Sequence, residues 1–339
     1  MRVILDGMGG DNAPVEIVKG AVQAAKEMSH EIYIVGKEDK IQKELDKYQY
    51  DPQQVKVVHA EEVITNEDSP VKAIKRKKNS SMVVGLTMVK NGEGDIFISA
   101  GNTGAQVVGG RMILGRINGI DRPALASIYP ILGDKACLLV DAGASAESKA
   151  HNLLEYGTMG SIYVEKVFGR PEPRVGLVNL GVEESKGTSV TKEAYKQLKQ
   201  APINFVGNVE ARDIPAGACD VIVCDGFVGN VILKLTEGLA WNILKLLKKK
   251  FLDGLKAKIG AMFLKNKLGE LKDEFDYTEY GGAPILGVDG AMVKMHGSSN
   301  ANAVKNTILK GIPYAEEGVV DKIKAAITDL EEIIAGEQQ

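Results

Sequence analysis

Aromatic residues and cysteines are scarce in this chain of 339 residues, and each scarcity excludes a class of protein. Aromatic residues make up 5% of the sequence, with a single Trp, so a surface that stacks on nucleic-acid bases is not expected. The three cysteines, Cys137, Cys219 and Cys224, are scattered and cannot build a disulfide framework. Cys219 and Cys224 border a strand-like run, where cysteine usually packs as a small hydrophobic residue rather than acting as a nucleophile. This usage is typical of a reduced, intracellular protein.

A strong charge of one sign and long apolar runs are also missing. The formal net charge of −3 provides no general attraction for DNA or RNA, so no nucleic-acid partner is expected. Nowhere do 18 consecutive residues stay apolar, so no transmembrane helix is predicted. The first residues, MRVILD, carry a charge at Asp6 and lack the apolar core of a signal peptide. We therefore predict a cytoplasmic protein.

Several catalytic motifs are absent as well. There is no G-x-x-x-x-G-K-[ST] and no G-x-S-x-G, which disfavours a P-loop nucleotidase and a serine hydrolase. The glycines at 7–10 have a different spacing from the dinucleotide-binding G-x-G-x-x-G. The four histidines match no zinc motif. A catalytic metal is therefore not expected, and a bound dinucleotide is disfavoured.

What the chain does contain is a repeated alternation of short β-branched runs and longer stretches with helical periodicity. Strands are predicted at 2–5, 31–35, 55–58, 95–98, 136–140, 174–178, 203–206 and 220–223. Helical patterns lie between them, for example at 15–28, 153–167 and 191–198. This alternation predicts an α/β fold with a mostly parallel sheet that is covered on both faces. No linker is visible, so we expect a single unit over 1–339.

Polar, glycine-rich loops follow most of the predicted strands. They occupy 6–14, 99–104, 179–187, 207–213, 225–230 and 296–302. Ligands of open α/β sheets bind beyond the carboxyl ends of the strands, so the six loops together predict one large shared site. The alternative for any single loop is that Gly and Asn simply form turns and helix caps.

An anion is the first candidate ligand of these loops. Asn102 and Thr103 precede a helical run at 104–114, where a side-chain cap leaves backbone N–H groups free for a phosphate. Lys78, followed by Asn79 and Ser80, precedes another helical pattern and suggests an anion clamp. The alternative is a solvated basic face.

Two more side chains are candidates for ligand contact. Lys186 lies in the acidic loop that begins at Glu183. His296 opens a Gly-Ser-Ser-Asn loop, and the alternative for it is an imidazole that caps its own loop.

The segment 242–272 differs from the rest of the chain in charge. It contains nine Lys and two acidic residues, a local net charge of +7 that leaves −10 elsewhere. Its apolar residues form one helical stripe, and Gly254 and Gly260 predict two short helices rather than one. Either the stripe faces the core, or the segment projects and docks on an anionic membrane or an acidic protein. The docking candidates are Leu244, Leu247, Lys248, Phe251, Leu255 and Ile259.

Nine blocks, in order along the chain, carry a resemblance to a known family. They are DGMGGDNAP at 6–14, KKNSS at 77–81, ISAGNTGA at 98–105, GIDRPAL at 119–125, PRVGLVNLG at 173–181, FVGNVEARD at 205–213, DGFVGNV at 225–231, YGGAPILG at 280–287 and HGSSNANA at 296–303. The chain resembles the bacterial phosphate acyltransferase family PlsX over nearly its whole length. It departs from the family pattern at Gly7, where Ala is usual, and at Ser145, where Asn is usual.

The resemblance implies a three-layer α/β/α sandwich, similar to phosphotransacetylases and to isocitrate and isopropylmalate dehydrogenases, that works as a homodimer without metal or cofactor. It implies that acyl-[acyl carrier protein] and inorganic phosphate become acyl phosphate and free carrier protein, the first step of phospholipid synthesis. The partners implied are acyl carrier protein, phosphate, an anionic membrane surface and a downstream membrane glycerol-phosphate acyltransferase.

The same resemblance gives a set of site residues. Those expected to bind phosphate are Asp11, Lys78, Asn79, Ser80, Asn102 and Thr103. Those expected at the reacting thioester are Asn179, Glu183, Lys186, Asn208, Glu210, Asp225, Asn230 and His296.

Two other functions remain as alternatives. A nicotinamide-dependent decarboxylating dehydrogenase of related fold would need a carboxylate cluster for Mg²⁺ or Mn²⁺, for which Asp220 and Asp225 are the nearest candidates. A non-catalytic scaffold at the membrane surface would use the Lys-rich segment and leave the six polar loops unexplained.

Overall fold

A computed structural model describes residues 1–133, 135–254, 260–264 and 281–336 of the chain. Within these residues, eleven strands form one sheet in the order β3-β2-β1-β4-β11-β10-β5-β6-β9-β7-β8. The strands are β1 (Arg2–Asp6), β2 (Glu31–Gly36), β3 (Val55–His59), β4 (Ile96–Ser99), β5 (Ala124–Ile131), β6 (Lys135–Val140), β7 (Val175–Val178), β8 (Phe205–Val209), β9 (Val221–Val223), β10 (Ala283–Leu286) and β11 (Ala291–Lys294).

The sheet is mostly parallel, as the sequence predicted, and its exceptions lie at the centre. β10 is antiparallel to both β11 and β5, and β5 is antiparallel to β6, whereas the other pairings are parallel. β10 and β5 are joined by only two residue pairs, Ile285 with Leu125 and Leu286 with Ala124. The predicted strands all form, but β5, β10 and β11 were not predicted. The change of strand direction therefore falls on the elements that sequence periodicity missed.

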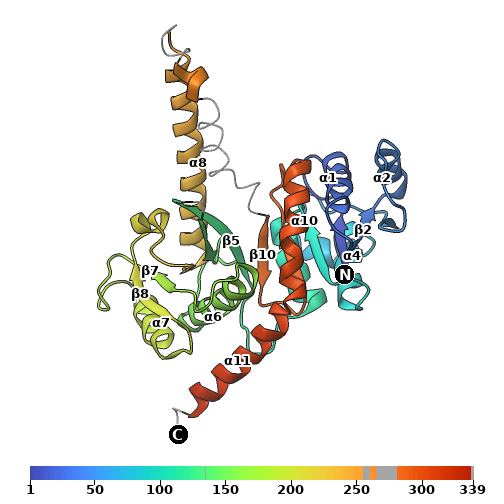
Figure 1. Ribbon diagram of the computed structural model, residues 1–339. Coiled ribbons are helices and arrows are strands. Elements are labelled where there is room, and N and C mark those ends of the chain that lie inside the picture. Colours follow the sequence, from blue (N-terminus) through green and yellow to red (C-terminus); the bar gives the residue numbers. More distant parts are fainter. Residues whose placement is uncertain (134, 255–259, 265–280, 337–339) are drawn as a thin grey trace.

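Helices cover both faces of the sheet (Figure 1). They are α1 (Val15–Ala25), α2 (Glu38–Leu45), α3 (Pro70–Arg76), α4 (Ser81–Lys90), α5 (Thr103–Gly109), α6 (Ala150–Val167), α7 (Ser189–Gln200), α8 (Gly226–Phe251), α10 (Ala301–Glu316) and α11 (Val319–Gly336). A π-helical turn, Gly110–Leu114, continues α5, and a 3₁₀ helix, Ala211–Ala216, follows β8.

Strand β1 shows how the sequence produces the layers. Alternate side chains of a strand point to opposite faces, so Val3 and Leu5 enter one buried core and Ile4 enters another. The first core contains Ile17 of α1, and the second contains Leu86 of α4. Two cores on opposite faces of one sheet make the three-layer sandwich that the resemblance implied.

Helix α8 differs from the other helices because most of it leaves the sheet (Figure 1). It ends at Phe251, and Gly254 has a φ of 88°, a left-handed value that a residue with a side chain rarely adopts. Residues 260–264 are helical again, in keeping with the break predicted near the two glycines. Leu244, Leu247 and Phe251 are half-buried, and the docking candidates Leu255 and Ile259 lie outside the described residues.

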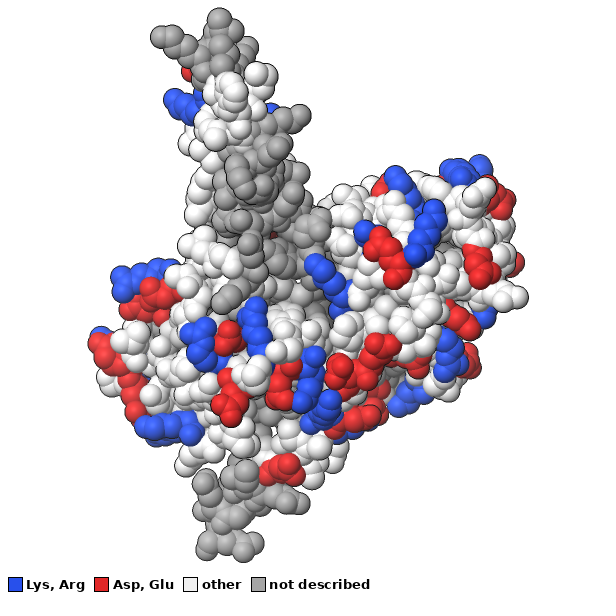
Figure 2. Space-filling model, in the orientation of Figure 1, with Lys and Arg blue, Asp and Glu red and all other residues white. Residues whose placement is uncertain are grey.

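The surface carries charges of both signs, as the near-neutral composition predicts. Figure 2 shows positive and negative side chains interspersed over the body of the molecule in this view. None of the helices in the described ranges has the length and apolar character that a bilayer crossing requires.

Candidate active site

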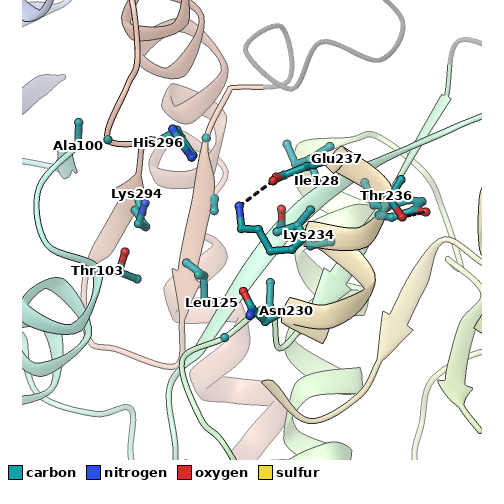
Figure 3. Close-up of a pocket in the computed structure, with 18 of the residues that line it drawn as sticks. Ala100, Thr103, Leu125, Ile128, Asn230, Lys234, Thr236, Glu237, Lys294 and His296 are labelled. Atoms are coloured by element: carbon teal, nitrogen blue, oxygen red, sulfur yellow. Dashed lines mark hydrogen bonds and ion pairs between the residues drawn. The ribbon is translucent and has the colours of Figure 1, made fainter. Parts of the chain in front are cut away.

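A cavity of about 510 Å³ opens where the central strands change direction (Figure 3). Its volume is within the usual range for small-molecule sites. The lining residues are Asn66, Ala100, Gly101, Thr103, Leu125, Ser127, Ile128, Tyr129, Pro130, Ala142, Gly143, Asn230, Leu233, Lys234, Thr236, Glu237, Ala240, Gly282, Ala283, Lys294, His296 and Gly297. Most come from the ends of β4, β6 and β11, from β5 and β10, and from the first four turns of α8. Asn66 comes from the loop between β3 and α3, and Thr103 from the start of α5.

A buried hydrogen-bond network holds the loop after β4 against the cavity. The Ser99 hydroxyl donates to the Asp6 carboxylate at 2.7 Å and accepts from the Gly101 N–H at 3.0 Å. Burial raises the pKa of Asp6, and hydrogen bonds from Ser81 and Ser99 oppose that rise. A Cβ on Gly9 would lie 2.5 Å from the Asp6 carboxylate, so this position requires glycine. The network fixes the backbone of Gly101 at the cavity wall.

The charged groups of the cavity are two lysines, a glutamate and a histidine. Lys234 pairs with Glu237 on α8 at 2.7 Å. Lys294 is half-buried at the end of β11, and its ammonium donates to the Met295 carbonyl at 2.9 Å. Burial, with a further contribution from the positive charge of Lys234, lowers the pKa of Lys294 to about 8. Burial and the positive charges of Lys294 and Lys234 likewise lower the pKa of His296, which favours a neutral imidazole at pH 7.

Three of the site residues predicted from the sequence line this cavity: Thr103, Asn230 and His296. Thr103 begins α5, Asn230 lies in the first turns of α8, and His296 follows β11 (Figure 3). The His296 Nδ1 atom lies 2.8 Å from the Ser298 hydroxyl, so the imidazole also holds its own loop. Three segments that are far apart in the sequence therefore meet at one cavity.

Other predicted phosphate-binding residues hold the loops in place. Asn102 caps α5 by accepting from the Ala105 N–H at 3.0 Å, and its amide donates to the Thr65 carbonyl at 3.0 Å. Ser80 caps α4, and its hydroxyl donates to the Lys77 carbonyl at 2.8 Å. These two side chains are buried and already hydrogen-bonded.

The remaining phosphate candidates do not line the cavity. Lys78 and Asn79 are exposed on the loop before α4, and Asp11 is exposed where its N–H donates to the Gly297 carbonyl at 2.8 Å. Asp11 is nevertheless adjacent to the cavity through Gly297.

Most of the residues predicted for the thioester end form a separate cluster beyond β7 and β8. The Asn179 amide donates to the Asn208 side-chain oxygen at 3.0 Å, and the Asn208 amide donates to the Glu183 carbonyl at 2.9 Å. The side chains of Glu183 and Lys186 are exposed, and Glu210 pairs with Arg212 at 2.8 Å. The six loops therefore do not all converge on the cavity.

Asp225 caps α8 rather than lining the cavity. Its carboxylate accepts from the Val228 N–H at 2.8 Å, and Gly226 beside it packs against the loop after β6. Asp220, the other metal candidate, forms ion pairs with Arg170 and Arg174. Among the described residues, no group of three or more His, Cys, Asp or Glu side chains is arranged to hold a metal ion.

Sequence reasoning missed Lys234, Glu237 and Lys294, the charged residues of the cavity. Lys294 ends a strand of four residues that was not predicted, and Lys234 lies inside a helix rather than in a loop. The signal that was available is the helical spacing of Asn230, Lys234 and Glu237, which places them on one face of α8. The three cysteines are buried, and burial raises the pKa of each thiol. For Cys219 and Cys224 this agrees with the packing role that the sequence predicted.

Solved structures of other proteins share this fold. A phosphotransacetylase from Streptococcus pyogenes aligns with a TM-score of 0.63 at 16% identity, covering 93% of this chain and 94% of its own. A 4-hydroxythreonine-4-phosphate dehydrogenase from Klebsiella pneumoniae aligns with a TM-score of 0.53 at 10% identity, covering 93% and 99%. At these identities the likeness shows the fold alone.

Sequence comparison gives the family. The profile of the family described as "Fatty acid synthesis protein" matches residues 1–322. A protein of Alkaliphilus oremlandii named phosphate acyltransferase is 54% identical over 330 residues, covering 97% of this chain and 98% of its own length. The chain belongs to this family, which confirms the resemblance seen in its nine sequence blocks.

Proposed function

We propose that the protein is a phosphate acyltransferase that takes an acyl group from acyl carrier protein and places it on inorganic phosphate. The main support for this function is the cavity, together with the membership of the chain in this family. One part of its wall is polar and cationic, with Thr103, Lys294 and His296, and another is apolar, with Leu125 and Leu233. A phosphate and an acyl thioester need these two environments side by side.

The chemistry requires no nucleophilic side chain. An oxygen of hydrogen phosphate attacks the thioester carbonyl carbon, the C–S bond breaks, and the phosphate proton passes to the departing thiolate. Holding the two reactants in line accounts for most of the rate gain, because a bimolecular step becomes effectively unimolecular. Hydrogen-bond donors at the carbonyl oxygen then stabilise the charge that develops there.

Support for direct substrate contact is strongest for the predicted residues that line the cavity. We assign Thr103 to the phosphate, and Asn230 and His296 to the thioester carbonyl. Asp11, Asn102 and Ser80 act through the loops that they hold, and Lys78 and Asn79 flank one of those loops. The cluster of Asn179, Asn208 and their neighbours is assigned to holding the loops beyond β7 and β8.

The dehydrogenase alternative is not favoured. The relatives that match along the whole chain are named phosphate acyltransferase, and Asp220 and Asp225 are engaged in ion pairs and a helix cap rather than gathered in one site.

A direct assay tests the proposed function. The protein is incubated with acyl-[acyl carrier protein] and radiolabelled phosphate, and labelled acyl phosphate is expected to appear together with free carrier thiol. A His296→Ala, Asn230→Ala double variant is the matched control and should form far less product. Release of thiol without labelled acyl phosphate would instead indicate a thioesterase.

The proposal includes a homodimer formed through α8. Exposed apolar side chains recur on this helix at spacings of three and four residues, which place them on one face. They are Leu235, Leu239, Ile243 and Leu246, with exposed fractions of 68, 58, 48 and 56%. Apolar surface of this extent favours burial against a second copy. Light scattering should give a dimer mass for wild type and for Asn242→Asp, and a monomer mass for Leu235→Asp, Leu239→Asp.

The Lys-rich end of α8 is proposed to dock the enzyme from the cytoplasm onto an anionic membrane, close to a glycerol-phosphate acyltransferase that consumes acyl phosphate. Lys245, Lys248, Lys249 and Lys250 are exposed there, and each Lys near such a surface contributes about 1 kcal/mol. Phe251→Glu should abolish co-sedimentation with anionic vesicles at low salt while activity in solution survives. If wild type ignores vesicles but binds carrier protein through these lysines, the acidic carrier is the partner instead.

A further inference from the structure

Lys294 occupies a position that the sequence did not single out, and its backbone is held from both sides. Strand β11 pairs with β4, where Lys294 is opposite Ser99, and with β10, where it is opposite Ala283. Its side chain leaves the end of the strand at the cavity wall. Figure 3 shows it between Thr103 and His296, across from Lys234. Because the backbone is held on both sides, the side chain starts from a fixed position at the cavity wall, which favours ligand binding.

In the part of the chain that the structure describes, no carboxylate forms an ion pair with Lys294. Its ammonium donates to the carbonyl of the next residue. Glu237, the carboxylate of this cavity, is 2.7 Å from Lys234 and is already neutralised by it. A half-buried ammonium without a counter-charge is unfavourable, and an anion in the cavity would compensate it.

We propose that Lys294 is the catalytic cation that binds the attacking phosphate, at the wall shared with Thr103 and His296. The inference rests on the proposed function and makes it more specific, because it names the charged contact of the phosphate. In this position the ammonium balances one negative charge of the phosphate. Thr103 supplies a neutral hydrogen-bond donor from the loop after β4.

The groups that face Lys294 set how phosphate binding depends on pH. They are Lys234 and Glu237 on α8 and His296 beyond the strand. Since the pKa of Lys294 is lowered to about 8 by burial, the ammonium loses its proton just above neutral pH when no anion is present. Phosphate affinity should therefore fall as pH rises past about 8, and this fall should be absent when residue 294 carries no titratable group.

The test compares two neutral variants, Lys294→Met and Lys294→Gln, with wild type and with Lys196→Met, an exposed lysine on α7. Isothermal titration with inorganic phosphate alone gives the affinity, and steady-state assays give the KM of phosphate and of acyl carrier protein thioester separately. Both Lys294 variants should bind phosphate roughly 10- to 100-fold more weakly, the usual cost of losing a hydrogen bond to a charged group. Their KM for the thioester should change little. Lys196→Met should match wild type.

The Lys294 variants are expected to fold, so a loss of phosphate affinity can be assigned to the missing ammonium. Removal of an uncompensated charge should leave the melting temperature of the Lys294 variants at or above the wild-type value. If both variants fold and bind phosphate as tightly as wild type, the inference is wrong, even if acyl phosphate is made. If wild type makes no acyl phosphate but binds phosphate through Lys294, the proposed function fails and the anion site stands.

Discussion

Two groups of loops look alike in the sequence and differ in the structure. Both are rich in Gly, Asn and charged residues, and both follow strands of the sheet. Around the cavity, Thr103, Asn230 and Lys294 face open space. Beyond β7 and β8, the side chains of Asn179 and Asn208 form hydrogen bonds with each other and with nearby backbone carbonyls. Polar segments therefore mark a binding site only where their side chains are not already used to hold their own loops.

The largest expected effect is on kcat and comes from Asn230, which lines the cavity. Asn230→Ala removes a proposed donor to the carbonyl oxygen and should lower kcat by roughly 10²–10³. The melting temperature should stay close to wild type, because the side chain is exposed. Steady-state kinetics and a thermal melt measure both quantities. Unchanged kcat would remove Asn230 from the reacting centre.

Asn208, in the cluster beyond β7 and β8, should show the opposite result, a loss of stability with little change in kcat. Asn208→Ala breaks the hydrogen bonds to Asn179 and to the Glu183 carbonyl in a site where Asn208 is only 7% exposed. The free energy of unfolding, measured in urea, should fall by about 1–3 kcal/mol, while kcat changes little. A large loss of kcat at unchanged stability would return this cluster to the catalytic site that the sequence suggested.

A smaller effect is expected at the start of α8. Asp225→Ala removes the side-chain cap of the helix that carries Asn230 and should cost about 1 kcal/mol of stability. Asp225→Asn or Asp225→Ser, which keep a capping oxygen, should restore most of it. If Asp225→Ala also loses activity and the cap-restoring variants recover stability but not activity, the carboxylate has a role in the reaction as well.

The last expected effect is a dependence of the free energy of unfolding on pH that belongs to Lys294. Its pKa is lowered from the ordinary lysine value of 10.5 to about 8 in the folded state, so the unfolded chain binds more protons between those values. Wild-type stability relative to Lys294→Met should therefore rise as pH increases from about 8 to 10.5. Parallel urea titrations in phosphate-free buffer measure this difference. A flat difference over that window would mean that Lys294 is as well solvated as an ordinary surface lysine.

The fold could be predicted to the extent that its strands are apolar, β-branched and followed by helices. The strands of the outer parallel parts have this pattern, for example RVILD in β1 and EIYIVG in β2. The antiparallel centre does not. β5 is ALASIYPI, with small residues and a proline, and β10 and β11 have four residues each and no helix between them. Tertiary pairing rather than local preference makes these segments strands.

The candidate site could be predicted only where it is made of loops. Thr103 and Asn230 were found because they follow Asn102 and Gly229 at helix starts, and His296 because it precedes Gly297 in a polar loop. Lys294 ends an unpredicted strand, and its environment depends on β4, β10 and α8 together. Asn179 and Asn208 were included among the predicted site residues because the sequence does not show that their two side-chain amides form a hydrogen bond with each other. Which polar groups are already partnered is a property of the folded chain.

The position of Trp241 has an optical consequence. It is the only tryptophan of the chain, and it is 67% exposed on the part of α8 that leaves the sheet. Intrinsic tryptophan fluorescence therefore reports on this helix and not on the sheet. An unfolding curve followed by fluorescence need not coincide with one followed by circular dichroism, and that mismatch would reflect the location of the probe rather than a folding intermediate.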